Sequence, residues 1–482
     1  MRFAFAPLAL ALAVAGCASV GPDYHRQTPA PLQLDSAGSA QVSGAAFEAA
    51  WWRQFGDPTL DALIRRAAAG NLDLKIAVAR LDEARALLGT AKSARWPDVD
   101  LGAGYTRSKA QQPGFGSERV SVDSYRAGFD ASWELDLFGG VRRGVQAARA
   151  DSEAGVADLQ AAQVSVIAEV ARNYFELRGT QLRMDVVRRD IDNLRQTLEL
   201  TRARLNVGSA SEQDVASAAA RLSAVEAQQP ALQIQARRAE DRLAVLLGER
   251  PGELGIDLSP AGFKPIDAVL PIGDAADVLQ RRPDVRAAER RLAAATARIG
   301  VAKADFFPHI SLGGFIGFIA GRSADLGEAS SKAWSIAPSI RWSGLNVQRV
   351  RSNLHASEAR ADAAQAQYRQ TVLQAVEDVD NALTAFDQQR LRVAKLIGQA
   401  RQSRRAADLA GVRYREGAAD FLELLDAERT ALAAEDDLAQ AETAVNTDAV
   451  AVYKALGGGW QACGDAQCTQ LAEVRSGADS PR

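Results

Sequence analysis

The 482-residue chain has few of the residues that build metal sites or disulfide-rich scaffolds. It holds three Cys and three His, and His25, His309 and His355 lie far apart in the sequence. Three cysteines exclude a disulfide-dense small fold, and three scattered histidines argue against a His-rich metal centre. The methionines are Met1 and Met184 alone, which argues against a methionine relay for copper or silver. We therefore expect no metal site and no cofactor.

Long hydrophobic runs are also scarce, because the N-terminus carries the only one. Hydrophobic residues make up 47% and charged residues 24% of the chain, so it can fold, but it is not a helical membrane protein. These fractions leave a β-barrel open, since barrel strands are only half apolar. The balance of 57 basic and 60 acidic residues gives a net charge of −3, which argues against nucleic-acid binding.

Catalytic motifs are absent from the sequence. We find no G-x-x-x-x-G-K-[ST], no G-x-S-x-G, no H-E-x-x-H and no C-x-x-C. The acidic residues are scattered along helical stretches, where a solvated face is the ordinary interpretation. The sequence therefore predicts that the protein is not an enzyme and has no catalytic residues.

The N-terminus has the features of a lipoprotein signal peptide. Arg2 precedes an apolar stretch over 3–14, and small residues stand immediately before Cys17. This pattern predicts cleavage after residue 16 and a covalent diacylglycerol and acyl anchor on Cys17. Ala18 favours sorting to the outer membrane of a Gram-negative bacterium. The alternative is an ordinary secretory signal with an incidental cysteine.

An internal repeat divides the rest of the chain. Residues 71–104 match 282–315 at a shift of 211, and Pro97 aligns with Pro308. A second match at a shift of 209 aligns Gly208 with Gly417. Because order and spacing persist through non-helical Pro and Gly positions, the match is not chance similarity between Ala-rich helices.

Each copy has the same predicted plan. A helix over 60–92 or 275–304 is followed by two strands, then by a long helix over 140–206 or 345–415. A Gly turn leads into a helix over 210–247 or 419–456, with a kink expected at Pro230. The predicted organisation is: 1–16 signal peptide; 17–56 anchor and equatorial segment; 57–248 first repeat; 249–272 linker; 273–457 second repeat; 458–482 C-terminal tail.

The four predicted strands read as membrane strands. Apolar and polar residues alternate over 98–107, 124–136, 309–319 and 333–343, each about the length that crosses a bilayer at a tilt. A half-buried soluble sheet alternates in the same way and stays the alternative. Pro338 does not suit a central strand and is interpreted as a bulge.

Strand number then predicts the assembly. Four strands cannot close a barrel, and an open edge in lipid leaves backbone groups unpaired at several kcal/mol each. Two chains would give eight strands filled by side chains, whereas three give twelve strands and a lumen, so we expect a homotrimer. The expected fold is mainly α with a small β part: an all-α long-helix periplasmic barrel plus a transmembrane β-barrel. The longest helices, at roughly 100 Å, would reach deep into the periplasm.

Several motifs together resemble one known family. The chain resembles the TolC-like outer-membrane efflux factors, in particular the NodT/OprM-type lipoproteins of tripartite, RND-type efflux systems. The resemblance covers essentially the whole mature chain and is carried by these motifs: Cys17 with Gly21-Pro22-Asp23-Tyr24; Trp51-Trp52 with Phe55, Asp57-Pro58 and Leu60; Arg281-Arg282-Pro283-Asp284-Val285; Arg413-Tyr414 with Gly417, running into Leu425-Asp426-Ala427.

The resemblance implies a passive, gated exit duct. Such a duct is lipid-anchored in the outer membrane, extends into the periplasm, and receives substrates from a periplasmic adaptor (membrane fusion protein) and an inner-membrane RND-type pump. The implied helix-tip turns for adaptor docking are Gly208 and Gly417. Two other functions remain open: a TolC-like duct for protein secretion, and a lipid-anchored periplasmic coiled-coil scaffold.

The resemblance also implies a gate at the second helical tip. In the family, Leu and Asp at the positions of Leu422 and Asp426 narrow the closed entrance, and some relatives carry a further acidic residue at the position of Glu423. Three-fold symmetry would turn Asp426 into a carboxylate ring, whose repulsion Arg413, Arg415 or Arg429 would offset. The alternative is a solvated helix face.

The tail contains Cys463 and Cys468, five positions apart. In an oxidising periplasm they could form a disulfide, and two free thiols are the alternative.

Overall fold

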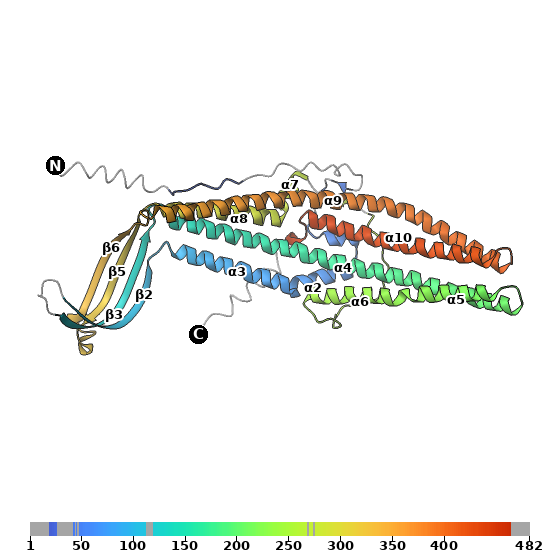
Figure 1. Cartoon of the computed structure of the whole chain (residues 1–482), viewed down its shortest axis with the longest axis horizontal. Coiled ribbons are helices and arrows are strands. Elements are labelled where there is room, and N and C mark those ends of the chain that lie inside the picture. Colours follow the sequence, from blue (N-terminus) through green and yellow to red (C-terminus); the bar gives the residue numbers. More distant parts are fainter. Residues whose placement is uncertain are drawn as a thin grey trace. The chain divides into compact units, whose positions relative to one another are not determined.

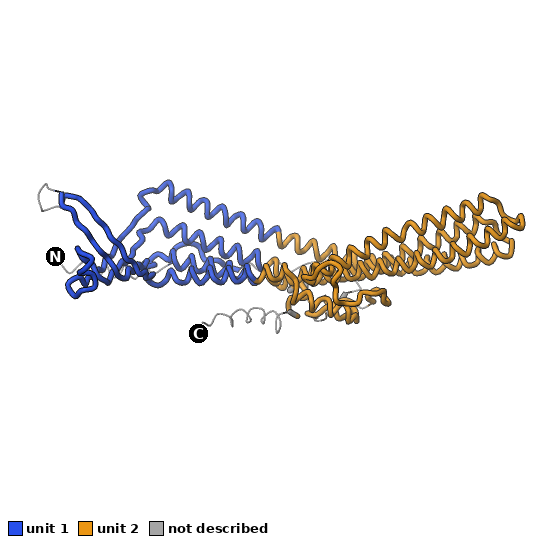
Figure 2. The backbone as a smooth tube through the Cα atoms, turned by 90° about the horizontal axis from the view of Figure 1, so that it is seen from below, with its two compact units in different colours: residues 1–28, 79–157, 286–370 blue, residues 29–78, 158–285, 371–482 orange. Residues whose placement is uncertain are grey.

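The computed structural model describes residues 19–26, 42–43, 45, 48–111, 119–267, 269–272 and 275–463. Cys17 and Cys468 lie outside these residues, and the side chain of Cys463 is not described. The lipid anchor and the tail disulfide therefore stay predictions. The chain forms two compact units, the first from 1–28, 79–157 and 286–370, and the second from 29–78, 158–285 and 371–482 (Figure 2).

Helices and strands recur in the same order in the two copies (Figure 1). The first copy contains α2 (Pro58–Gly70), α3 (Leu72–Ser93), β2 (Asp98–Gln111), β3 (Arg119–Leu135), α4 (Gly140–Asn206), α5 (Glu212–Glu226) and α6 (Gln228–Leu247). The second contains α7 (Ala275–Arg281), α8 (Pro283–Ala304), β5 (His309–Ala320), β6 (Lys332–Arg341), α9 (Val347–Arg415) and α10 (Phe421–Ala455). Short elements complete the described chain: β1 (Val42–Ser43), η2 (Trp51–Phe55), β4 (Leu270–Pro271), η3 (Ser323–Asp325), η4 (Ala329–Ser331) and η5 (Trp460–Cys463).

The expected fold class is confirmed, since long helices dominate and the two copies contribute one four-stranded sheet. The sheet has the order β2-β3-β5-β6 and is antiparallel throughout. One hairpin comes from each copy, and β3 pairs with β5 where the hairpins meet. None of the described helices combines the length and the apolar composition needed to cross a membrane.

In the second unit, the long helices pack through small apolar clusters. One cluster joins α4, α5, α6 and α10 through Val187, Val225, Leu232 and Leu432. A second cluster joins α4, α5, α9 and α10 near the two Gly turns and includes Tyr414 and Phe421. Both clusters combine side chains from the first and the second copy. The core of this unit is therefore built between copies, where the apolar stripes of four helices meet.

Three predicted helices are interrupted. The predictions of one continuous helix over 60–92 and 275–304 were wrong, and instead of the kink expected at Pro230 there is a break at Ala227. The 60–92 helix breaks at Asn71, whose side-chain Oδ1 accepts from Leu74 N and so starts α3. The 275–304 helix breaks at Arg282, because the proline that follows disfavours helical geometry there. The 210–247 helix breaks at Ala227. This places Pro230 in the first turn of α6, where its missing N–H costs no helix bond.

The expected bulge at Pro338 does not occur. The register of β5 and β6 runs without interruption through Leu312 opposite Pro338. Strand β6 is an edge strand of the sheet within this chain, which is where a strand tolerates a proline.

Candidate functional site

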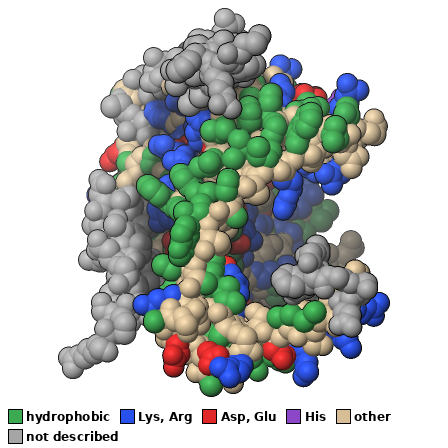
Figure 3. All heavy atoms as spheres, turned by 90° about the vertical axis from the view of Figure 1, so that its left-hand side faces the viewer, with side chains coloured by type: hydrophobic (Ala, Val, Ile, Leu, Met, Phe, Trp, Pro, Cys, Tyr) green, Lys and Arg blue, Asp and Glu red, His purple; other side chains and the backbone are tan. Residues whose placement is uncertain are grey.

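One face of the four-stranded sheet is apolar and exposed. Leu101, Phe129, Ile316 and Trp334 stand side by side across β2, β3, β5 and β6. Their side chains are 74%, 51%, 65% and 75% exposed, which is far from the burial such residues normally reach. Figure 3, a view from the side of this sheet, shows hydrophobic side chains gathered there. A contiguous apolar surface of this kind marks a lipid or protein contact.

The opposite face of the sheet is polar and rich in glycine. Arg126 forms an ion pair with Asp130, and its guanidinium lies 4.0 Å from the ring centroid of Phe315. A Cβ atom at Gly128 would lie 2.7 Å from the Phe315 ring, so only glycine leaves room for that ring. Phe315 therefore lies on the polar face and is almost buried. This explains why the alternation of β5 is less regular in the sequence than that of the other strands.

The two edges of the sheet, β2 and β6, have no neighbouring strand in the described chain. Each edge presents a row of backbone N–H and C=O groups that a further strand could pair. An open sheet with one exposed apolar face is thus incomplete as a single chain.

The two predicted Gly turns join the long helices as expected. Gly208 and Gly417 have φ of 73° and 75°, a left-handed conformation that favours glycine. Behind each turn, N–H groups return to the last carbonyls of the long helix, from Ser209 to Arg204 in one and from Ala418 to Arg413 in the other. Both long helices therefore end in the same hydrogen-bonded cap.

The predicted gate residues lie on the first turns of α10. Asp420 caps the helix by accepting from Glu423 N at 2.8 Å. The Leu422 side chain is 64% exposed. Glu423 forms an ion pair with Arg413, and Arg429 donates to Asp426 at 2.7 Å.

Two of the three arginines expected to offset the gate carboxylates are therefore paired with them. All four of these side chains are exposed within the single chain, at 45% to 67%.

The corresponding first tip uses different contacts. Ser211 and Asp214 form a capping box, in which each side chain binds the other's backbone N–H. Arg204, which aligns with Arg413, does not pair with a carboxylate at its own tip. It donates to the carbonyl of Tyr414 at 2.8 Å and lies 4.4 Å from that ring's centroid, so it joins the first copy to the second. Sequence reasoning missed this contact.

A buried polar side chain marks the helix break in each copy. Asn71 donates to the carbonyl of Leu246 at 2.8 Å, and Arg282 donates to the carbonyl of Ala455 at 2.9 Å. Both positions and both carbonyls correspond in the repeat. Each of the two side chains thus binds the C-terminal end of the last helix of its own copy. We call these two contacts the helix-break joints.

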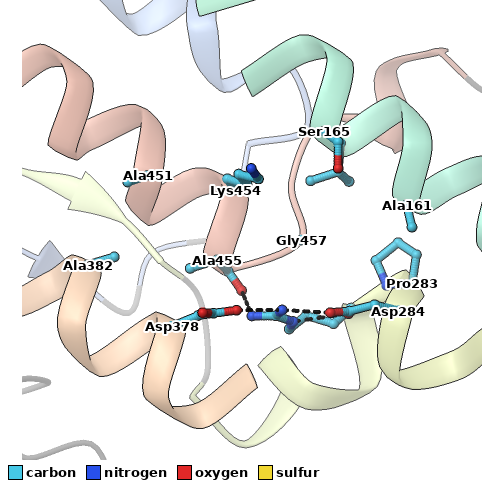
Figure 4. Close-up of a pocket in the computed structure, with 12 residues that line it drawn as sticks. Ala161, Ser165, Pro283, Asp284, Asp378, Ala382, Ala451, Lys454, Ala455 and Gly457 are labelled. Carbon is cyan, nitrogen blue, oxygen red and sulfur yellow. Dashed lines mark hydrogen bonds and ion pairs between the residues drawn. The ribbon is translucent and has the colours of Figure 1, made fainter. Parts of the chain in front are cut away.

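The second of these joints lines a cavity of about 340 Å³ (Figure 4). Asp284 and Asp378 lie on either side of the Arg282 guanidinium, at 2.6 and 3.0 Å. Burial opposes the charge of Arg282, but these two carboxylates outweigh it and raise the arginine pKa. The Arg-Arg-Pro-Asp motif is thus explained by a structural role.

The N-terminal Gly-Pro-Asp-Tyr motif is also bound into the structure. Arg143, almost fully buried, donates to the carbonyls of Val20 and Gly21 and to Asp23, at 2.8 to 3.1 Å. Tyr24 donates to Glu289 at 2.6 Å. Burial opposes ionisation of Glu289, but its hydrogen bonds from Arg290 and Tyr24 prevail and lower the pKa of that carboxyl.

The Trp51-Trp52 motif belongs to the core of the second unit. Trp51 is fully buried and stacks on Tyr453 with ring centroids 5.0 Å apart. Trp52 donates to Asp61 at 3.0 Å, and this bond lowers the pKa of the Asp61 carboxyl. Like the other motifs outside the tips, this pair serves packing. Within the described residues, no cluster of three or more His, Cys, Asp and Glu could hold a metal ion.

Comparison with known proteins assigns the chain to a family. The family model described as "Outer membrane efflux protein" matches residues 63–249 and 275–458, one segment for each copy. The toluene efflux pump outer membrane protein TtgF of Pseudomonas putida is 32% identical over 95% of this chain and 98% of its own. The pyoverdine export outer membrane protein OpmQ of Pseudomonas aeruginosa is 31% identical over 90% of this chain and 94% of its own.

Among solved structures, the outer-membrane channel OprN is similar with a TM-score of 0.89 and 47% identity. That match covers 92% of this chain and 100% of the other. Together with the repeat, the sheet and the paired helical tips, these matches show that the chain belongs to the outer membrane efflux protein family.

Proposed function

We propose that this protein is the outer-membrane exit duct of a tripartite efflux system, working as a homotrimer. The observation that carries the proposal is the four-stranded sheet, which is exposed and apolar on one face and open at both edges. Three such sheets can pair β6 of one chain with β2 of the next. Twelve strands then satisfy every edge and enclose a lumen with the polar face inside.

For the same assembly we propose the domain organisation given above, with 17–56, 249–272 and 458–482 as equatorial segments. Cys17 would carry the lipid anchor. Val20 to Asp23 lie bound to Arg143 close behind it, so the anchor would be tethered to the helices next to the sheet. Two or more acyl chains on Cys17 would anchor this end of the chain firmly in the outer membrane.

The partners we propose are a periplasmic adaptor and an inner-membrane RND-type pump, with adaptor docking near the turns at Gly208 and Gly417. Relatives are named for the export of pyoverdine and of toluene. We infer that the cargo is likewise a small molecule and that the pump selects it. The chain itself would supply a conduit and no chemical step.

The gate we propose consists of Leu422, Glu423 and Asp426 at the second tip. Its support is the exposure of Leu422 together with two exposed ion pairs that can open without disturbing a core. Such pairs contribute only about 0.2–1 kcal/mol each, so they suit a closed state that a docked partner can open.

Single-channel conductance in planar bilayers tests the gate. The double variant Glu423→Ala, Asp426→Ala should raise the conductance, because it removes both carboxylates and frees Arg413 and Arg429. The matched control is Asp185→Ala, Asp192→Ala, which removes two exposed carboxylates from α4. Equal conductance in the gate variant and the wild type would refute the gate.

Fractionation and toxicity assays test the duct itself. We expect the protein in the outer membrane as an SDS-resistant, heat-modifiable trimer, and its deletion should sensitise cells to drugs, dyes or solvents. A periplasmic scaffold would lack heat-modifiable mobility. A protein-secretion duct would instead lose an exported protein on deletion while drug tolerance stays unchanged.

A further inference from the structure

A cluster of charged side chains lies inside the bundle that carries the two tips. Asp190 of α4 is 1% exposed and is flanked by the apolar Val187 and Ile191. Charged groups act on it from three other helices: Arg221 from α5, Arg404 from α9, and Glu435 from α10. Helix α6 contributes the apolar Leu232 to the same core. We call the buried Asp190 and the half-buried Arg221, Arg404, Glu428 and Glu435 the charge cluster.

The hydrogen bonds of this cluster are incomplete. Arg404 is committed to Glu435 through two bonds of 2.6 and 2.7 Å. Glu428 Oε1 accepts from Thr197 at 2.9 Å. Among the described residues, Asp190 Oδ2, Glu428 Oε2 and Arg221 Nε have no hydrogen-bond partner although all three atoms are buried. Since a buried carboxylate without partners is costly, the cluster favours a proton over a full negative charge.

Burial is the largest influence on both carboxyls and outweighs the neighbouring arginines. Burial raises the pKa of Asp190 to about 6, against the opposing charges of Arg221 and Arg404. Burial also raises the pKa of Glu428, and the negative charge of Asp190 adds to it. Asp190 therefore changes charge over a pH range in which exposed aspartates stay ionised.

We propose that Asp190, together with Glu428, is a proton-responsive switch that sets how tightly α4 and α5 of the first copy pack against α9 and α10 of the second. When Asp190 is protonated, the contact between copies holds no unpaired negative charge at this position. When it is ionised, the same contact holds an unpaired charge that water stabilises better. The consequence for gating rests on the proposed channel, whereas the proton site does not.

The direction of the pH effect follows from the linkage between proton binding and helix packing. The packed state binds a proton with a pKa of about 6, and a loosened, hydrated Asp190 would return toward 3.8. Acidification thus favours the packed tips, and neutral pH favours loosening. If the loosened state fully hydrates Asp190, the packed-to-loosened ratio should rise up to about tenfold between pH 7.5 and pH 5.

Two measurements on the purified full-length protein test the switch. Infrared difference spectra should show a protonated carboxyl that titrates near pH 6 in the wild type and disappears in Asp190→Asn. In planar bilayers, open probability should fall up to about tenfold from pH 7.5 to pH 5. Asp190→Asn should keep it low at both pH values. The control is Asp192→Asn, an exposed neighbour on the same helix, which should behave as the wild type.

If Asp190→Asn does not fold, Glu428→Gln serves instead and should reduce the same pH response. Because burial also raises the pKa of Asp448 to about 6, the switch is overturned if Asp190→Asn removes no carboxyl band that titrates near pH 6, or if it keeps the wild-type pH response. A protein that conducts at no pH contradicts the proposed channel, while the infrared titration still decides the proton site.

Discussion

The two helical tips share a backbone and differ in their side-chain contacts. Gly208 and Gly417 make the same left-handed turn, and Ser211 and Asp420 cap the helices that follow. At the next matched position, however, Asp214 folds back to complete a capping box, whereas Glu423 turns to Arg413. The aligned arginines differ in the same way, because Arg204 reaches across to Tyr414.

This difference separates two tasks. At the first tip, the capping box pairs the backbone N–H groups of the helix start, and Arg204 binds the second copy. The polar groups of this tip therefore stabilise the fold. The second tip leaves its carboxylates in exposed ion pairs that break at little cost. A duplicated unit can therefore keep one tip as a support and the other as the part that responds.

The largest expected effect lies at the two helix-break joints, where a substitution in the second copy should destabilise the protein more than the matching substitution in the first. Arg282→Ala removes charged hydrogen bonds to a buried carbonyl and should lower the free energy of unfolding by about 3 kcal/mol. Asn71→Ala removes a neutral bond to the matching carbonyl and the cap on Leu74 N, and should cost about 1–2 kcal/mol. Chemical unfolding in detergent measures both, with Arg65→Ala, an exposed position, as the control. Equal costs would mean that the joints are interchangeable.

The next effect compares the aligned arginines. Arg204→Ala should cost about 2 kcal/mol, because it removes a charged hydrogen bond and a cation–π contact between copies. Arg413→Ala should cost about 0.5–1 kcal/mol, since it breaks an exposed pair and an exposed hydrogen bond to the carbonyl of Ala418. The same unfolding experiment decides between them. A reversed order would contradict the division between a supporting tip and a responding one.

The two Gly turns should be destabilised equally by alanine, because they share the same left-handed backbone conformation. Gly208→Ala and Gly417→Ala should each cost about 1 kcal/mol, because alanine is strained in the left-handed region. Gly89→Ala is the control of opposite sign. Gly89 lies in the interior of α3 with open space around it, so alanine there should stabilise by about 0.5–1 kcal/mol. Unequal costs at the two turns would show that the backbones are not equivalent.

The smallest effect concerns salt. Arg429→Gln should cost about 0.3–0.5 kcal/mol at low ionic strength and nothing measurable in molar salt, because both partners are exposed. Arg204→Gln should keep most of its cost in the same salt, since its acceptor is a part-buried carbonyl. Stability curves at two salt concentrations provide the comparison. A salt-resistant Arg429 effect would place that pair in a protected site.

Much of the fold could be read from the sequence because it depends on patterns. Alternation located the strands, the aligned Pro and Gly positions exposed the repeat, and the scarcity of proline allowed helices as long as α4 and α9. The breaks at Asn71 and Arg282 were missed because a helix pattern continues through them. The local signals, Pro283 after Arg282 and the Asn71 cap on Leu74 N, act together with the tertiary contacts to the Leu246 and Ala455 carbonyls.

The candidate site was accessible only in part for the same reason. The pairs Glu423–Arg413 and Asp426–Arg429 are local, and the sequence named both arginines as candidates near the gate carboxylates without assigning these pairs. Arg204 with Tyr414, and Asp190 with Arg404, join residues more than 200 positions apart, and no short-range pattern brings them together.

The open edges of the sheet have a genetic consequence. In the proposed ring of three chains, a subunit with one defective edge still pairs through its other edge, so it enters the ring and leaves one gap that unseals it. When a defective copy is made in equal amount with a normal one, only about one ring in eight holds three normal chains. An edge mutation should therefore be dominant, and even a cell that keeps an intact gene should lose most of its function.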